Sequence, residues 1–177
     1  MRLRAGLVAL HFKAVLNFGA VLSLWSTSGF AAHITIAPWG DDPAHAMVIV
    51  EGSLVAGDDI QFRTQVGRLT KAIVAFNSAG GNLLAGIEIG KTIRLKSFAT
   101  AVLDGQSCAS ACAIAWLGGL PRFMGHTAHV GFHAAYIEKA GRASESGVGN
   151  ALVGSYLTQI GLSESAVATL PRQRPLK

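Results

Sequence analysis

The stretch that decides the fold runs from Cys108 to His133 and reads CASACAIAWLGGLPRFMGHTAHVGFH. It opens with Ser110 between two cysteines, continues in a small apolar run and turns at residues 118–121 (GGLP). A short β-like segment then ends in His133, which lies 23 positions after Ser110. Serine and histidine are residue types that form a nucleophile and its general base. The stretch therefore predicts a nucleophile at Ser110 and a base at His133.

Apolar runs and helical patterns alternate on both sides of this stretch. The run at residues 72–76 is nearly continuous, which is typical of a strand covered on both faces of a mostly parallel sheet. Residues 33–45 and 138–147 read as loops. The alternation of strands with helices predicts an α/β fold. The expected strands are 47–51, 72–76, 99–103, 121–124 and 129–132, and the expected helices are 61–70, 82–95, one starting at Ser110, 150–160 and 164–170.

A glycine turn at residues 77–81 (NSAGG) joins an expected strand to an expected helix. Two adjacent glycines allow positive φ angles and a close approach of the backbone to a ligand. Ser110 is expected in the first turn of a helix, where backbone N–H groups are unpaired and the helix dipole is positive. The N–H of Ala111 and a second N–H from Gly80 or Gly81 are therefore predicted to form an oxyanion hole.

The first 31 residues are predicted to be a secretory signal peptide. A positively charged start is followed by an apolar run at residues 14–25 and by small residues around Ala31. The alternative is an uncleaved membrane anchor, but a spanning helix needs about 20 apolar residues and Lys13 interrupts this one. We expect a periplasmic or otherwise exported protein, with membrane association through this segment if it is retained.

The charge of the chain is concentrated at its two ends. Removing residues 1–31 takes away three basic residues and no acidic one, which lowers the formal net charge from +5 to +2. Residues 32–170 are close to neutral, whereas nucleic-acid binding needs basic residues clustered on one folded face. We expect no nucleic-acid partner, one domain over residues 32–170 and a basic, disordered tail at 171–177.

The two cysteines of the chain, Cys108 and Cys112, are four positions apart. On a helical turn this spacing puts their Cα atoms about 6 Å apart, within disulfide range, and disulfides persist in exported proteins. Two buried thiols are an equal alternative. A single C-x-x-x-C pair is weak as a metal site. His126, His129 and His133 are also poor ligands together, because four positions on a straight strand separate two of them too widely. We expect no metal and no cofactor.

These motifs, in this order, resemble those of the ClpP/crotonase-like superfamily. The relatives in question are the Clp protease proteolytic subunit, signal peptide peptidase A and bacterial exported proteins with a C-x-S-x-C nucleophile turn. The resemblance covers about residues 47–160. The turn at 77–81 is similar to the family's N-S-P-G-G turn, with Ala79 in place of proline. Residues 109–111 are similar to its nucleophile motif, residues 119–122 (GLPR) to its G-x-x-R turn, and His133 stands at its histidine position.

The resemblance implies a spiral of β-β-α units and the activity of a serine protease, a hydrolase. It assigns the nucleophile to Ser110, the base to His133 and an oxyanion-hole N–H to Gly80. It also implies a peptide or protein substrate. Because relatives form rings or tetramers, it implies a homo-oligomer.

Two departures from the family pattern leave alternatives open. The family's third triad residue is an acid well downstream of the histidine, but the acids after His133 are in no matching context, and the expected domain is C-terminally short. A catalytically impaired module that acts in peptide binding or assembly is therefore the alternative. A serine–lysine pair is another route. The acids are Glu138, Glu145 and Glu164, and the lysines are Lys71, Lys91, Lys96 and Lys139.

Overall fold

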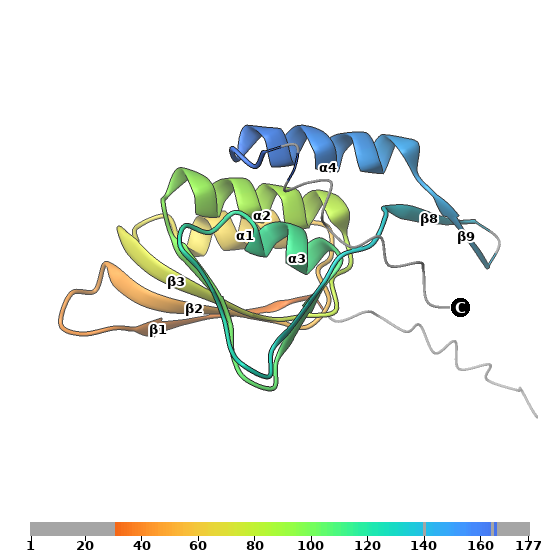
Figure 1. Ribbon diagram of the computed structural model, residues 1–177. Coiled ribbons are helices and arrows are strands. Elements are labelled where there is room, and N and C mark those ends of the chain that lie inside the picture. The colour runs from red at the N-terminus through yellow and green to blue at the C-terminus, as the bar shows by residue number, and fades with distance from the viewer. Residues whose placement is uncertain (1–30, 140, 164, 166–177) are drawn as a thin grey trace, which may run out of the picture.

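The computed structural model describes residues 31–139, 141–163 and 165 (Figure 1). Apart from position 31, the expected signal peptide or anchor lies outside the described residues. The expected tail at 171–177 and nearly all of the expected helix at 164–170 also lie outside them. Within the described ranges, none of the helices combines the length and the apolar character needed to cross a membrane.

A five-stranded sheet forms the base of the molecule. The first strand pairs antiparallel with the second, and the other neighbours pair in parallel. The prediction of an α/β fold is confirmed, with a mixed sheet and four helices in the described residues. The strands, in their order across the sheet, are β1 (His33–Pro38), β2 (His45–Glu51), β3 (Lys71–Asn77), β4 (Ala99–Val102) and β6 (Arg122–Met124).

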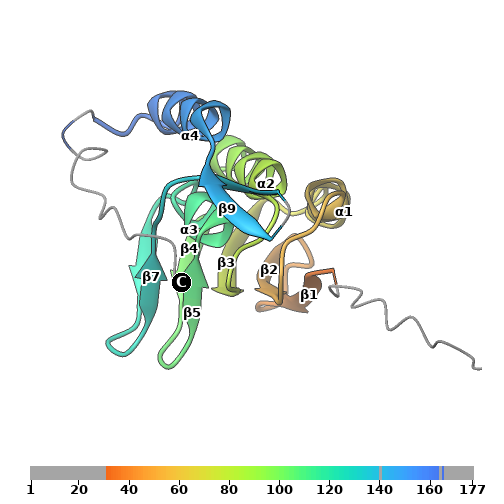
Figure 2. The ribbon, with the colours of Figure 1, turned by 90° about the vertical axis from the view of Figure 1, so that its right-hand side faces the viewer.

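Two smaller sheets and the helices complete the fold. Figure 2 shows the first small sheet as two strands side by side, and both views place α4 over α2 on the side away from the large sheet. The small sheets are β5 (Ser107–Ala109) parallel with β7 (His129–Gly131), and β8 (Tyr136–Lys139) antiparallel with β9 (Arg142–Glu145). The helices are α1 (Asp58–Gln65), α2 (Leu83–Leu95), α3 (Ala111–Trp116) and α4 (Gly147–Gln159).

The main core lies between the large sheet and the helices α1, α2 and α3. Successive side chains of a strand point to opposite faces, so every second residue of β2 faces the helices. Val48 and Val50 are fully buried there and pack in one cluster with Phe62 and Val66. Burial of these side chains holds α1 on the sheet.

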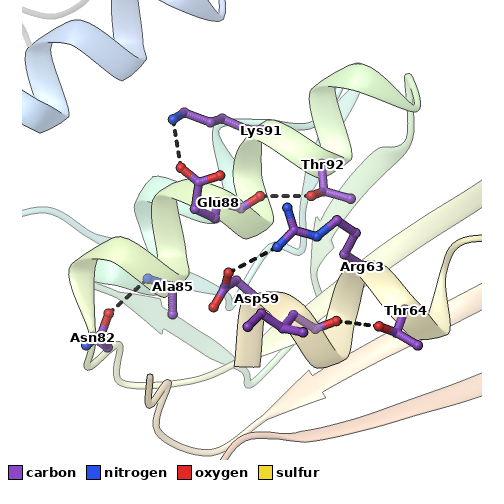
Figure 3. A network of polar contacts seen from close by, with 9 residues as sticks. Asp59, Arg63, Thr64, Asn82, Ala85, Glu88, Lys91 and Thr92 are labelled. Atoms are coloured by element: carbon purple, nitrogen blue, oxygen red, sulfur yellow. Dashed lines mark hydrogen bonds and ion pairs between the residues drawn. The ribbon is translucent and has the colours of Figure 1, made fainter. Parts of the chain in front are cut away.

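Helix α2 is defined by its first residues and by its two faces. The side chain of Asn82 accepts a hydrogen bond from the N–H of Ala85 at 2.9 Å and so caps the helix (Figure 3). On the outer face, Lys91 forms an ion pair with Glu88 at 2.7 Å, also drawn in Figure 3. On the inner face, Gly86 has no room for a side chain, because a Cβ there would meet the backbone of α3. This close contact brings the start of α3 beside the start of α2.

Two segments expected to be loops form strands instead. Residues 33–38 are β1, whose buried Ile34 and outward-facing neighbours repeat with period two. Most of 138–147 belongs to the β8–β9 hairpin, whose last strand is exposed throughout. The expectation was wrong for this hairpin because a solvent-exposed pair of strands has no apolar alternation to reveal it. The three-residue strand β5 also has no sequence signal, because it is defined by its pairing with β7.

The helix expected at 61–70 begins and ends earlier, at Asp58 and Gln65. Gly57 occupies the N-cap position. The buried carboxylate of Asp58 accepts hydrogen bonds from the N–H groups of Val55 at 2.7 Å and Ala32 at 3.2 Å. These long-range and local contacts explain why this aspartate lies inside the helix.

Replacement of Phe62 by alanine tests the main core. Phe62 is fully buried, so Phe62→Ala leaves a cavity and is expected to lower the free energy of unfolding by about 3–5 kcal/mol. The measurement is urea unfolding followed by circular dichroism. Ile60→Ala is the matched control, because Ile60 is on the same helix and 61% exposed. Equal losses in the two variants would contradict the placement of α1.

Candidate active site

The backbone of Ser110 has an unusual conformation. Its φ is 57° and its ψ is −126°, between the end of β5 and the first residue of α3. A non-glycine residue with such angles costs about 1–3 kcal/mol and persists only where the surroundings impose it. Here the N–H of Ser110 donates to the carbonyl of Gly131 at 2.8 Å, and its carbonyl accepts from Ile114 at 3.1 Å. A sharp strand-to-helix turn of this kind exposes a nucleophile's side chain.

The glycine turn lies directly against Ser110. A Cβ built at Gly80, whose φ is 98°, would be 2.6 Å from Cβ of Ser110 and 2.6 Å from the carbonyl oxygen of Ala109. Any other residue at position 80 would push the two segments apart. Ser78 joins them further, since its N–H donates to Ser107 at 2.8 Å and its carbonyl accepts from Ala109 at 3.0 Å. The structure thus brings the two predicted motifs together.

The three backbone N–H groups predicted for an oxyanion hole differ in availability. Gly80 is buried, and its N–H donates to Oγ of Ser78 at 3.1 Å. Within the described part of the chain, the N–H groups of Gly81 and Ala111 have no hydrogen-bond partner. Both of these residues line the same pocket as Ser110, whereas Gly80 does not. Gly81 and Ala111 are therefore the pair that can donate to a ligand.

His133 also lines this pocket and is half-buried. Its Nδ1 is 2.8 Å from the carbonyl oxygen of Ala134. Because a carbonyl only accepts, this contact places the hydrogen on Nδ1 and leaves Nε2 as an acceptor. The ring of Tyr136 lies beside the imidazole, with centroids 5.4 Å apart. In the residues described, no hydrogen bond joins His133 to the hydroxyl of Ser110.

The pocket has a volume of about 320 Å³, and both polar and apolar groups line it. Four of its aliphatic side chains come from α2, α3, β8 and α4; they are Leu83, Ile114, Ile137 and Val153. The sequence did not predict the contribution of β8, because the apolar pair at 136–137 is too short to show an alternating pattern. The described residues contain no cluster of metal-ligating side chains.

Three of the lysines considered for a serine–lysine pair are engaged elsewhere. Lys91 pairs with Glu88, and the ammonium group of Lys96 donates to the carbonyl of Leu69 at 2.8 Å. Lys71 lies over the ring of Trp39 at 5.6 Å. None of these three lines the pocket.

The arginine of the GLPR turn closes the end of α3. Arg122 donates to the carbonyl oxygens of Leu117 at 2.8 Å and Gly119 at 3.1 Å. Burial, with a smaller contribution from the nearby charge of Arg94, lowers the pKa of Arg122 from its usual value. Arg122 does not line the pocket, so its contacts give it a structural role.

Cys108 and Cys112 form a disulfide, with their Cα atoms 5.3 Å apart and both side chains fully buried. The first cysteine is in β5 and the second is in α3, so the bond spans the strand-to-helix turn. The four-residue spacing predicts that the cysteines meet across one helical turn. In the structure they meet across the sharp turn at Ser110 instead. The disulfide therefore encloses Ser110 in a short covalent loop.

No protein-family model matches the sequence, and no curated protein matches it. The structure is similar to that of 1510-N, a membrane-bound stomatin-specific protease, in a mutant form. The TM-score is 0.50 and the sequence identity is 16%. The match covers 63% of this chain and 59% of the length of that protein. It is also similar to Pseudomonas aeruginosa PA4980, with a TM-score of 0.51 and 16% identity over 77% of this chain and 68% of that one. At such low identity the likeness shows a shared fold, one that a protease also has.

Alkylation of the cysteines tests the disulfide. The unfolded but unreduced protein is expected to take up no iodoacetamide, and the reduced protein is expected to take up two groups, as read by intact mass. The double variant Cys108→Ala/Cys112→Ala should be less stable by about 2 kcal/mol, because the loop that constrains the unfolded chain is short. Alkylation of the unreduced protein at both cysteines would contradict the disulfide.

Proposed function

We propose that this protein is a serine peptidase of the cell envelope, with Ser110 as nucleophile and His133 as base. The observation that carries the proposal is the strained backbone of Ser110 beside two unpaired N–H groups, in a pocket that also contains an imidazole. Strained backbone, unpaired donors and a base in one cavity are what acyl transfer needs.

The first chemical step uses each of these groups. Oγ of Ser110 attacks the carbonyl carbon of a peptide bond, and its proton passes to Nε2 of His133. The carbonyl oxygen becomes an oxyanion, which accepts hydrogen bonds from the N–H groups of Gly81 and Ala111. The dipole of α3 adds little, because the helix has only six residues. The backbone donors therefore carry the stabilisation.

The second half of the reaction returns the proton. Nε2 protonates the leaving amine as the peptide C–N bond breaks, and an acyl ester remains on Ser110. Water then attacks the ester, gives its proton to Nε2 and releases the acid, and Ser110 regains its proton. His133 retains the hydrogen on Nδ1 throughout.

We further propose that the fold is the ClpP/crotonase-like spiral, which the structural likeness to a protease supports. The motifs at 77–81, 109–111 and 131–133 support the same assignment. The aliphatic side chains that line the pocket suit an uncharged side chain of a peptide or protein substrate. The proposed location is the periplasm or another exported compartment, where the disulfide would persist. The proposal also includes a homo-oligomer and a cleaved signal peptide, with attachment to the membrane by a retained N-terminal segment as the alternative to cleavage.

The alternative function is peptide binding or assembly on the same fold without catalysis. Two observations favour it: His133 makes no hydrogen bond with Ser110, and within the described residues no carboxylate contacts its ring. Catalytic hydrogen bonds are often long before substrate binds, so the first observation does not decide the matter. Peptide binding that persists in Ser110→Ala, in a protein that never acts on peptides, would favour this alternative.

Labelling with a fluorophosphonate tests the nucleophile. We expect a single covalent adduct on Ser110, located by peptide mapping, because the probe phosphonylates serines activated by a base and an oxyanion hole, with loss of fluoride. Ser110→Ala should take up no probe while its circular dichroism spectrum stays the same. His133→Gln should label at least about 100-fold more slowly, because the general base is lost.

Ser97→Ala is the matched control for these variants. Ser97 has a φ of 54° and is, with Ser110, one of two non-glycine residues of positive φ in the described chain, but it is exposed and does not line the pocket. Its replacement should leave the adduct unchanged. A folded wild-type protein that never labels would rule out the proposed peptidase.

A further inference from the structure

A continuous chain of hydrogen bonds leads from His133 to a carboxylate. Nδ1 of His133 bonds to the carbonyl oxygen of Ala134 at 2.8 Å. The N–H of Ala135, which belongs to the same peptide group as that carbonyl, donates to Oδ1 of Asn150 at 2.7 Å. Nδ2 of Asn150 in turn donates to Oε1 of Glu145 at 2.7 Å. We call these four parts the His133–Glu145 relay.

The direction of every bond in the relay is decided by the chemistry of its atoms. The carbonyl of Ala134 only accepts, the N–H of Ala135 only donates, and the carboxylate of Glu145 only accepts. These constraints orient the amide of Asn150 and place a hydrogen on Nδ1 of His133. In each of the three bonds, the donor is therefore the partner nearer the imidazole and the acceptor is the partner nearer the carboxylate. Hydrogen bonds in such a chain polarise one another, so the part-buried bonds near His133 make the carbonyl of Ala134 a stronger acceptor, while the bond to Glu145 is exposed to solvent.

Helix α4 supports the middle of the relay. Asn150 is in its first turns, and the N–H of Ser146, just before the helix, donates to the carbonyl of Ala135 at 2.7 Å. A Cβ at Gly149 would be 2.7 Å from Cβ of Ala135, so the helix lies directly against this segment. Tyr156 anchors α4 in the second core cluster and is only 1% exposed. The segment that follows His133 is thus held by a helix that is itself anchored in the core.

We propose that Asn150 and Glu145 are positioning residues that act on His133 through the peptide group between Ala134 and Ala135. They would replace the acidic member of a catalytic triad, which holds the imidazole in the tautomer with its hydrogen on Nδ1. The inference rests on the proposed function, because it assigns His133 the role of base. Each relay proton stays on its own donor, and only Nε2 gains and returns the proton of the nucleophile.

The first test compares two variants of α4. Asn150→Ala removes both amide contacts of the relay and is expected to slow fluorophosphonate labelling of Ser110 about tenfold, in the rate of phosphonylation at saturating probe and not in probe affinity. Gln159→Ala removes an exposed amide from the last residue of the same helix and should label at the wild-type rate. Both proteins are checked for folding by circular dichroism and thermal unfolding.

An exchange of the amide and the carboxylate separates positioning from general stability. Asn150→Asp retains an acceptor for the N–H of Ala135 but faces Glu145 with a second carboxylate, and should also label about tenfold more slowly. Adding Glu145→Gln restores a hydrogen bond, now from the new amide to the new carboxylate. The double variant should be labelled at a rate within about threefold of the wild-type rate. Glu88→Gln, a charge change of equal size on α2, should have no such rescuing effect.

The outcomes decide the relay and the proposed function separately. The relay is overturned if Asn150→Ala is labelled as fast as Gln159→Ala. It is also overturned if the double variant Asn150→Asp/Glu145→Gln is labelled no faster than Asn150→Asp alone. If the folded wild type does not label at all, the proposed function fails. The relay is then tested by the ¹⁵N NMR signals of the His133 imidazole, which are assigned by their absence in His133→Gln. A single Nδ1–H tautomer that becomes mixed in Asn150→Ala supports it, and an unchanged spectrum overturns it.

Discussion

The positive φ of Ser110 is the constraint on which the rest of the site depends. The chain passes from β5 into α3 through this strained turn, and three separate contacts hold it in place. Gly131 binds its N–H, the Cys108–Cys112 disulfide closes the loop around it, and Gly80 packs against its Cβ. The cost of the strain is of the same order as one or two hydrogen bonds, so these contacts suffice to maintain it.

Close backbone contact is what assembles the pocket from distant parts of the chain. Residues without side chains at positions 80, 86 and 149 let the glycine turn, α3 and the segment before β8 approach to backbone distance. The first half of the chain thereby supplies the N–H of Gly81, and the second half supplies the imidazole. Helix α4 and its cap then contact Ala135, two residues after the imidazole. The two sides of the pocket therefore depend on different packing contacts, which makes their effects experimentally separable.

The local site is a more specific indicator of function than the shared fold. A fold common to this chain and a protease at 16% identity is compatible with many activities. The features that favour acyl transfer are local: a strained serine, two unpaired N–H groups and an imidazole with a defined tautomer. The absence of a carboxylate at the ring, within the described residues, marks where this site differs from a standard triad.

Local patterns in the sequence determined the α/β alternation, the start of α2 at its Asn82 cap and the positions of the two motifs, because these depend on neighbours a few residues apart. The two cysteines also limited any intramolecular disulfide to one pairing. Tertiary structure alone decided which glycine N–H remains available, since the N–H of Gly80 donates to the hydroxyl of Ser78 and the N–H of Gly81 does not. It also decided the β8–β9 hairpin and the alignment of Asn150 with the segment after His133. These features are contacts between segments whose separate sequences contain no trace of their partner, so only the folded chain specifies them.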